Sequence, residues 1–311
     1  VDGVSITLKK NEILAIVGES GCGKSTLATS IVGLHDHNKT KVEGEIIYNG
    51  INLAKLNDEK FNAVRGEEIG MIFQDPLSAL NPLMKIQDQI EESLAFHTKL
   101  SKSERKKRVL ELLKQVGIPN PERTAKQFPH QLSGGMRQRV IIAIAISCKP
   151  KVIIADEPTT ALDVTIQAQI LDLLIDLQKE TGSGIILITH DLGVVAEVAD
   201  RVAVMYAGQI IEEAPVEELF SNPLHPYTRS LFNSIPQMNS ENDRLEVIQG
   251  IVPSLAKLPR EGCRFSARIP WISEETHEKN PVLHEVSPGH LVRCTCWQHF
   301  HFEGEKGEVT N

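Results

Sequence analysis

A glycine-rich segment near the start of the chain has the residue types that hold phosphate. Residues 18–25 fit the pattern G-x-x-x-x-G-K-[ST]. The glycines let the backbone wrap an anion, and the N–H groups at the start of a following helix bind it. Lys24 adds a positive charge near the terminal phosphates, and Ser25 offers its hydroxyl to Mg²⁺. The motif predicts a nucleotide site lined by Gly18, Ser20, Gly21, Cys22, Gly23, Lys24, Ser25 and Thr26. Cys22 stands where almost any residue is allowed, so we assign it no redox role.

Two adjacent carboxylates, Asp156 and Glu157, follow an apolar run at residues 151–155 that is typical of a buried strand. Open α/β sheets place ligand chemistry at the carboxyl ends of their strands. A hard cation needs oxygen ligands, so Asp156 is suited to Mg²⁺. Glu157 is suited to orient or deprotonate an attacking water.

A second glycine-containing segment, residues 132–139, reads Leu-Ser-Gly-Gly-Met-Arg-Gln-Arg. Ser133 is a favourable N-cap, and the two glycines leave backbone amides uncovered at the start of an apolar helix. This is a second candidate anion site. Because one nucleotide already has its site at residues 18–25, the spare site suggests a phosphate that another chain supplies.

The elements that must position these residues alternate between strands and helices. Near-continuous apolar runs predict strands that are buried on both faces, as in a parallel sheet covered by helices. These expected strands are 12–17, 151–155 and 185–189. A weaker alternation predicts a strand at 4–8, and strand-like patterning runs from 42 to 73 with a turn at Asn49-Gly50.

Helical patterning follows the phosphate segment to Ile31 and dominates residues 77–150, where Ser101 and Glu104 form a capping box. A further helix is expected over 164–179, and a hairpin at 202–212 turns at Ala207-Gly208. Prolines and polar residues become frequent after Phe220, where we place a domain boundary.

Composition excludes several classes of protein. The chain of 311 residues is 41% hydrophobic, which argues against wholesale disorder, and its net charge of −8 argues against binding nucleic acid by bulk charge. Five scattered cysteines favour a reducing compartment over a disulfide scaffold. The densest apolar run, 140–146, is far too short to span a membrane. The chain starts at Val1 rather than Met, so we expect residues upstream.

Six segments in order resemble the ATP-binding cassette (ABC) family over roughly residues 1–220. They are the loop 18–25, Gln74 in Phe73-Gln74-Asp75-Pro76, the signature 132–138, Asp156-Glu157, Ala161-Leu162-Asp163, and His190 in Thr189-His190-Asp191. The resemblance implies ATP and Mg²⁺ as ligands, with Ser25, Gln74 and Asp156 on the metal. It implies catalytic roles for Glu157, for Gln74, which contacts magnesium and water, and for His190, which holds the γ-phosphate.

The resemblance also implies a dimer in which two cassettes pack head to tail. The signature residues Ser133, Gly134, Gly135 and Gln138 would close over the partner's ATP, and Asp163 would couple the two sites. The implied fold is α/β, a P-loop NTPase (RecA-like) core with an antiparallel β subdomain, an inserted helical subdomain at about 77–150, and a C-terminal extension. We expect the nucleotide-binding domain at 1–220 and the extension at 221–311.

Residues 75–82, 222–228 and 262–265 are similar to those of the ATPases of oligopeptide, dipeptide and nickel permeases. The resemblance implies an ATPase that energises peptide import at the cytoplasmic face of a membrane. Its expected partners are a second, homologous ATPase in a heterodimer, two transmembrane permease subunits and an extracytoplasmic peptide-binding protein, without nucleic acid. Import of nickel or glutathione stays an alternative, as does, in another class, a soluble cassette protein acting on DNA or ribosomes.

Relatives of this type often carry four cysteines that hold an iron–sulfur cluster. Here only Cys263 and Cys294 match, and Ile269 and Thr276 occupy the other two places, so we expect no such cluster. We expect the tail merely to pack. A zinc site built from Cys294, Cys296, His299 or His301 is the alternative, although Cys-x-Cys is not a standard zinc spacing. The family also stacks adenine on an aromatic residue before the first strand, and we see none before Val4.

Overall fold

The computed structural model describes residues 1–36, 38–160, 162–233, 258 and 261–303. The chain forms two compact units. The first unit consists of Val1–Thr7, Leu14–Lys24 and Thr189–Asn311, and the second unit consists of Leu8–Ile13 and Ser25–Ile188.

The second unit contains three parallel strands, β4 (Ile69–Ile72), β5 (Val152–Asp156) and β6 (Gly184–Ile188). In their register Met71 lies opposite Ile154, and Ile154 lies opposite Ile186. Almost every residue of these strands is buried. The parallel arrangement confirms the prediction from the apolar runs, because only a strand covered on both faces can be apolar at every position.

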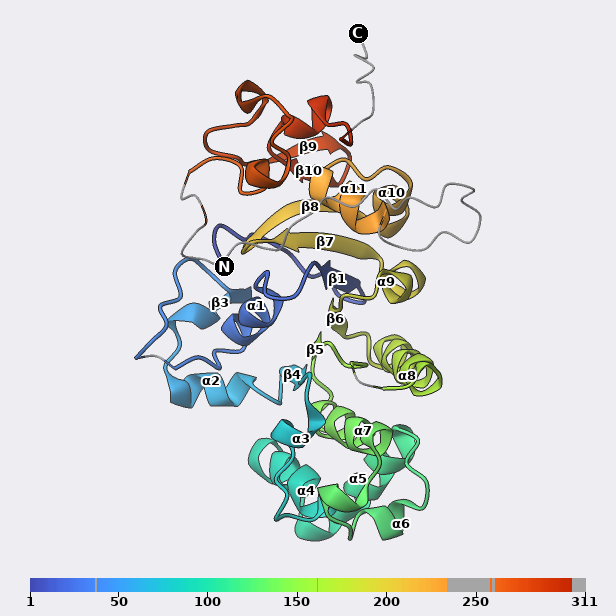
Figure 1. Cartoon of the computed structure of the whole chain (residues 1–311). Coiled ribbons are helices and arrows are strands. Elements are labelled where there is room, and N and C mark those ends of the chain that lie inside the picture. The colour runs from blue at the N-terminus through green and yellow to red at the C-terminus, as the bar shows by residue number, and fades with distance from the viewer. Residues whose placement is uncertain (37, 161, 234–257, 259–260, 304–311) are drawn as a thin grey trace. The chain divides into compact units, whose positions relative to one another are not determined.

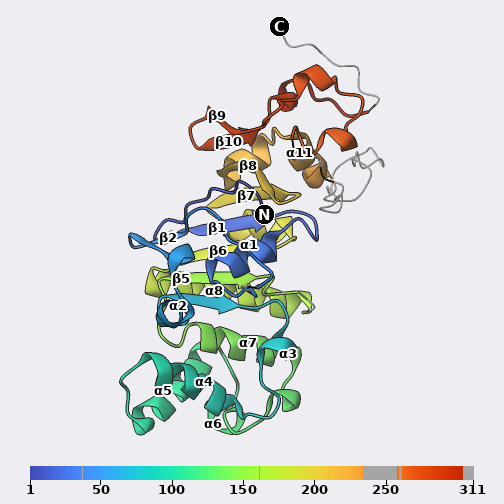
Figure 2. The same cartoon turned by 90° about the vertical axis from the view of Figure 1, so that its left-hand side faces the viewer.

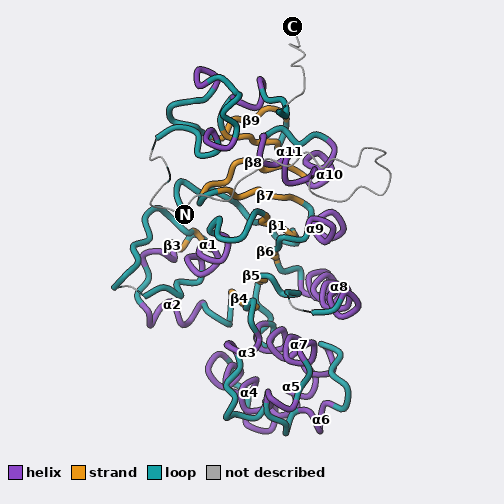
Figure 3. The backbone as a smooth tube through the Cα atoms, viewed as in Figure 1, coloured by secondary structure: helices purple, strands orange, loops and turns teal. Residues whose placement is uncertain are grey.

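Helices are the main regular structure of the second unit, and several of them gather beside β4 (Figures 1 and 3). They are α3 (Pro76–Ala79), α4 (Ile86–His97), α5 (Lys102–Gln115), α6 (Pro121–Thr124) and α7 (Gly134–Ala145). The helices α4, α5 and α7 pack on one another and bury the side chains of Ile90, Leu112 and Val140. The predicted capping box is confirmed, since Ser101 and Glu104 exchange hydrogen bonds at the start of α5.

The predicted helix at 164–179 is confirmed, whereas the predicted strand-like stretch at 42–73 is confirmed only in part. The helix expected over 164–179 is confirmed as α8 (Val164–Thr181). The strand-like stretch 42–73 is only partly strand. It holds the hairpin of β2 (Ile47–Tyr48) and β3 (Ile51–Asn52), which turns at Asn49-Gly50 as expected, but also the helix α2 (Asp58–Val64). The Asn57 side chain accepts a hydrogen bond from Lys60 N and starts this helix.

The first unit is built on β1 (Ile13–Val17), which pairs in parallel with β7 (Arg201–Tyr206). Three antiparallel pairings continue from β7 through β8 (Gln209–Pro215) and β10 (His290–Arg293) to β9 (Leu283–Ser287). These strands lie side by side in Figure 2. The predicted hairpin at 202–212 is confirmed, and its turn residues Ala207 and Gly208 both have positive φ.

The strand expected at 4–8 is wrong, because these residues pair with no strand among those described. A side chain rather than a sheet holds this backbone, since the Arg201 guanidinium donates to the Thr7 carbonyl. The weak alternation of the sequence therefore marked an extended segment, not a paired one.

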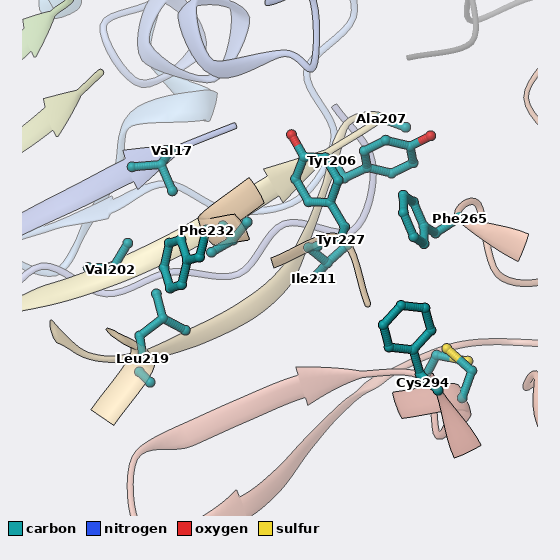
Figure 4. Close-up of a cluster of buried hydrophobic side chains, with 14 of the residues drawn as sticks. Val17, Val202, Tyr206, Ala207, Ile211, Leu219, Tyr227, Phe232, Phe265 and Cys294 are labelled. Atoms are coloured by element: carbon teal, nitrogen blue, oxygen red, sulfur yellow. The ribbon is translucent and has the colours of Figure 1, made fainter. Parts of the chain in front are cut away.

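The core of the first unit joins residues from both sides of Phe220. Helices α9 (Leu192–Val198), α10 (Val216–Ser221) and α11 (Pro226–Asn233) belong to this unit. Tyr206 of β7, Tyr227 of α11 and Phe265 pack ring against ring, with centroids 4.8–5.6 Å apart (Figure 4). The boundary at Phe220 stays a prediction. In the part of the chain that the structure describes, no helix has both the length and the apolarity to span a bilayer.

Candidate active site

The phosphate loop, Gly18–Ser25, joins β1 to α1 (Lys24–Ile31) as predicted. Gly18 has φ 151°, and a Cβ there would lie 2.1 Å from the Met205 carbonyl oxygen, so a side chain at this position would clash with β7. Lys24 is 5% exposed, and its Nζ donates to the carbonyl oxygens of Gly18 at 2.7 Å and Glu19 at 3.1 Å. These bonds hold the ammonium group over the loop. Burial raises the pKa of the Cys22 thiol, and Lys24 only partly offsets this.

Ser25 and Asp156 lie together in the second unit. The Ser25 hydroxyl donates to Asp156 Oδ1 at 3.1 Å, and Asp156 is the last residue of β5. The pair joins the end of the phosphate loop to the first of the two adjacent carboxylates. A hydroxyl beside a carboxylate is an oxygen donor set that suits a hard cation such as Mg²⁺.

Glu157 follows directly and is held by its backbone and its side chain. Its φ is 45°, a left-handed conformation that is uncommon outside glycine, and its N–H donates to the Ile188 carbonyl at 2.9 Å. Its Oε2 accepts from Gln74 Nε2 and from the Thr160 hydroxyl, each at 2.9 Å. The structure thus brings two predicted site residues into contact. The sequence analysis missed Thr160, whose only signal was its place three residues after Glu157.

Gln74 is positioned by the elements on either side of it. The residue follows the end of β4, and the next residue, Asp75, caps α3 by accepting from Leu77 N at 2.9 Å and Ser78 N at 3.3 Å. Gln74 therefore lies in a short connection whose two ends are fixed, by the buried strand β4 before it and by the capped helix α3 after it.

The signature residues start α7 in the second unit. Ser133 is exposed and caps the helix by accepting from Met136 N at 3.3 Å. Gly134 and Gly135 occupy the first two helical positions, and a Cβ on Gly135 would lie 2.8 Å from Ile166 Cγ2 in α8. Gln138 faces inward, with 1% of its surface exposed. Gly135 therefore allows α7 to pack closely on α8, and both glycines leave backbone amides uncovered at the start of the helix.

Asp163 and His190 are placed next to helix starts. Asp163 caps α8 by accepting from Ile166 N at 3.0 Å, whereas Ala161 of the same predicted loop lies outside the described residues. His190 is an exposed residue of the first unit, between Thr189 and the α9 cap Asp191. The role of His190 in holding the γ-phosphate stays a prediction.

The C-terminal part of the first unit reaches the phosphate loop, which the sequence analysis did not anticipate. The Tyr227 hydroxyl accepts a hydrogen bond from Glu19 N at 2.8 Å, and Arg268 Nη1 lies 3.2 Å from the Glu19 carboxylate. Burial raises the pKa of Tyr227 above its ordinary range, so this phenol stays neutral. Tyr227 belongs to the segment 222–228, which we had used only as a marker of subfamily.

Glu212, a buried carboxylate on β8, holds the segment 222–228 in place. Glu212 accepts from Leu224 N at 2.8 Å and His225 N at 3.0 Å, and its Oε1 lies 2.8 Å from His290 Nε2 of β10. Burial lowers the pKa of His225 to about 4, so its ring is neutral. This cluster ties residues 222–228 to β8 and β10.

With this geometry in place, two family models match the chain. Residues 1–160, slightly more than half of the chain, match the model for the ABC transporter. The chain belongs to the ABC transporter family. Residues 211–275 match a second model, the C-terminal region of the oligopeptide/dipeptide transporter.

Named relatives of this ABC chain cover nearly all of it. It is 55% identical over 304 residues to the oligopeptide transport ATP-binding protein OppD of Lactococcus lactis subsp. cremoris, covering 97% of this chain and 90% of that protein. It is 49% identical to the dipeptide transport ATP-binding protein DppD of Bacillus subtilis, covering 96% of this chain and 88% of the relative.

A solved ABC cassette has the same fold. The cassette MJ0796, solved as a dimer in a post-hydrolysis state with ADP and Pi, aligns with a TM-score of 0.61 at 35% identity, over 68% of this chain and 88% of its own. The likeness confirms the predicted P-loop NTPase fold class.

Proposed function

We propose that this chain binds ATP with Mg²⁺ and hydrolyses it to energise uptake of oligopeptides or dipeptides through a membrane transporter. The observation that carries the catalytic part is the Glu157 carboxylate held by Gln74 and Thr160, next to the Ser25–Asp156 pair. The peptide part is supported by the matched C-terminal region and by the relatives named for oligopeptide and dipeptide transport.

The oxygen donors of Ser25, Gln74 and Asp156 fit a magnesium ion. The Ser25 hydroxyl already meets the Asp156 carboxylate, so two of the three proposed ligands lie together. Bound there, Mg²⁺ would neutralise negative charge on the phosphates. The residues themselves position the nucleotide: the phosphate loop supplies backbone N–H groups and Lys24 supplies a positive charge.

Glu157 is the proposed base for the attacking water. Because its carboxylate accepts hydrogen bonds from Gln74 and Thr160, it is oriented before the nucleotide reacts. Phosphoryl transfer needs little covalent help, so such positioning and charge stabilisation supply most of the catalysis. His190 is proposed to hold the γ-phosphate.

The signature is proposed to act on a second cassette. Its exposed Ser133 and the amides at the start of α7 form an anion site in addition to the phosphate loop. A second, homologous ATPase would place its own ATP there, with Asp163 coupling the two sites. The dimer would work at the cytoplasmic face of the membrane with two permease subunits and an extracytoplasmic peptide-binding protein.

Replacing Glu157 with Gln tests the catalytic assignment. We expect ATP turnover by the assembled transporter to fall by about 10²–10⁴-fold, because the amide cannot take a proton. A fluorescent-ATP titration should show unchanged binding. The matched control is Glu180→Gln, at an exposed carboxylate on α8 that bonds Gln115. Parent turnover in Glu157→Gln would refute the role as base.

The transport assignment is tested in cells. In a strain deleted for the gene, the parent chain should restore uptake of labelled peptides and Glu157→Gln should not. Tagged chain isolated from detergent-solubilised membranes should carry permease subunits with it. Restored nickel or glutathione uptake in place of peptide uptake, or co-purification with nucleic acid alone, would refute the peptide assignment.

A further inference from the structure

Four potential metal ligands converge in the C-terminal part of the first unit. The thiol sulfurs of Cys263, Cys294 and Cys296 and a ring nitrogen of His277 all lie within 4.8 Å of one another. The three cysteines are at most 6% exposed. They come from separate places: Cys263 precedes the short helix η4 (Ser266–Arg268), His277 follows η5 (Glu274–Thr276), and the other two follow β10.

The spacing of these atoms fits one ion better than a cluster. A tetrahedral zinc ion with Zn–S bonds of about 2.3 Å keeps its ligand atoms about 3.8 Å apart. In a four-iron cluster each thiolate binds a different iron, and in a two-iron cluster the four thiolates are divided between two irons. The four sulfurs therefore spread farther apart than four ligands that share one ion. Donor atoms gathered within 4.8 Å match the single ion.

The residues at the other two cluster positions of the family cannot bind iron here. Ile269 is fully buried in the apolar core of the first unit. Thr276 donates its hydroxyl to the Ser273 carbonyl at 2.7 Å. The iron–sulfur cluster of the wider family therefore does not fit this chain, and the two donors that replace those positions are His277 and Cys296.

His277 supplies an independent sign of a missing partner. Both of its ring nitrogens are buried, and neither has a hydrogen-bond partner among the described residues. A buried polar atom without a partner costs about 1–3 kcal/mol. An ion bound by one ring nitrogen would remove much of that cost and explain why a half-buried histidine keeps its ring nitrogens out of solvent beside three thiols.

The backbone around Cys294 suits a thiolate ligand. Glu278 N donates to Cys294 Sγ at 3.4 Å, the kind of outer-shell hydrogen bond that stabilises a coordinating sulfur. Cys294 has φ 68°, a left-handed conformation that gives the chain a sharp bend just before Cys296. The bend explains how a Cys-x-Cys pair, unusual in spacing, points two sulfurs at one place.

Two histidines that the sequence analysis considered as zinc ligands, His299 and His301, do not belong to the set of four ligand residues. His299 is exposed, and His301 Nδ1 lies 3.4 Å from the His299 carbonyl oxygen, outside the set. The sequence alone had paired Cys294 and Cys296 with these nearby histidines. The fold instead brings in Cys263 and His277 from earlier in the chain.

We propose that Cys263, His277, Cys294 and Cys296 bind one structural Zn²⁺ ion. Cys₃His is an established ligand set for structural zinc, and four protein ligands close the coordination shell, so the ion has no open position for catalysis. It fastens the segment at Cys263 to the end of β10. That segment continues to Phe265 of the aromatic core (Figure 4). It then reaches Arg268, which contacts Glu19 of the phosphate loop.

Elemental analysis of the full chain, purified through a tag without histidine, tests the proposal. We expect about one zinc per chain, with no acid-labile sulfide. Cobalt replacement should give the intense visible bands of a tetrahedral thiolate site. Removing the ion with a strong chelator should lower the Tm by about 5–10 °C if the ion is normally near 100 times its Kd. Iron with acid-labile sulfide, or a metal-free chain with an unchanged Tm, would overturn the proposal.

Substitutions separate this site from adventitious binding. Cys296→Ser and His277→Ala should lower zinc retention against a competing chelator by about tenfold or more. Cys148→Ser and His299→Ala are the matched controls, since Cys148 lies in the second unit and His299 is exposed. Controls that lose zinc equally, or site variants that keep it, would refute the ligand set.

A thiol-protection measurement on the parent chain does not depend on how the variants fold. With zinc bound, Cys263, Cys294 and Cys296 should resist alkylation together, and all should become reactive once a chelator is added. Equal alkylation of these three cysteines with and without the chelator would refute the proposal.

Discussion

The phosphate loop and the C-terminal Cys/His cluster (Cys263, His277, Cys294 and Cys296) differ in how far apart along the chain their working atoms lie. The loop gathers its glycines, Lys24 and Ser25 into Gly18–Ser25, so one strand and one helix suffice to place them. The cluster draws its ligands from Cys263, His277 and the bend after β10. A site built from neighbours leaves a motif in the sequence, whereas a site built from distant segments leaves only scattered residue types.

The part of the first unit that follows Phe220 also contacts the phosphate loop. Tyr227 and Arg268 both contact Glu19, so residues C-terminal to Phe220 support the phosphate loop from outside its motif. The local motif therefore depends on non-local packing. Three substitutions probe this comparison.

Lys24→Ala should have the largest effect of the three. Removing the ammonium group removes charge-assisted hydrogen bonds to phosphate, and we expect ATP affinity to fall by about 10²-fold, or nearly 3 kcal/mol. A fluorescent-ATP titration measures it, with Lys114→Ala on the surface of α5 as the control. Unchanged affinity would mean that the motif is not the nucleotide site, and the contrast with the C-terminal cluster would fail.

Tyr227→Phe should have an intermediate effect and sharpens the link between the regions. Without the hydroxyl, Glu19 N–H loses its acceptor, at a cost of about 1–2 kcal/mol in the free energy of unfolding, and ATP affinity should weaken a few-fold. Urea unfolding and the same titration measure both quantities.

Tyr206→Phe is the matched control, since Tyr206 packs in the same aromatic cluster but lies beside Arg268, whereas the Glu19 N–H donates to Tyr227. Losing the Tyr206 hydroxyl should cost less in the free energy of unfolding than losing the Tyr227 hydroxyl, because it leaves the acceptor of Glu19 N–H in place. Equal losses in the two variants would show that ring packing, not the bond to Glu19, supports the loop.

His290→Gln should give the smallest effect, visible as a pH dependence. Burial lowers the pKa of His290, but hydrogen bonding to Glu212 and Glu218 outweighs this and raises it above its ordinary value. The stability from this raised pKa is fully present below the unfolded pKa of about 6.5, and it is lost as pH rises through the folded value.

The Tm advantage of the parent chain over His290→Gln should therefore shrink as the pH rises from about 6.5 through the raised pKa of His290. Thermal unfolding at several pH values measures it. An advantage that grows with pH would contradict the ion pair between β10 and β8.

Local patterns predicted most of the elements that carry the site. Buried strands showed as apolar runs, and helix starts showed as capping residues such as Ser101. The failures have local causes too. The alternation at 4–8 did not reveal that the segment lacks a partner strand, and Asn57 with the acidic residues of the next turn marked α2 within a stretch that looked strand-like.

By itself, the sequence determined the phosphate loop, the adjacent carboxylates and the signature, because each is a run of neighbours whose spacing the backbone converts directly into geometry. Only the tertiary structure decided that Thr160 holds Glu157, that Tyr227 and Arg268 support Glu19, and that His277 joins three cysteines. These contacts form between segments that only the packing of the core brings together, so no local pattern records them.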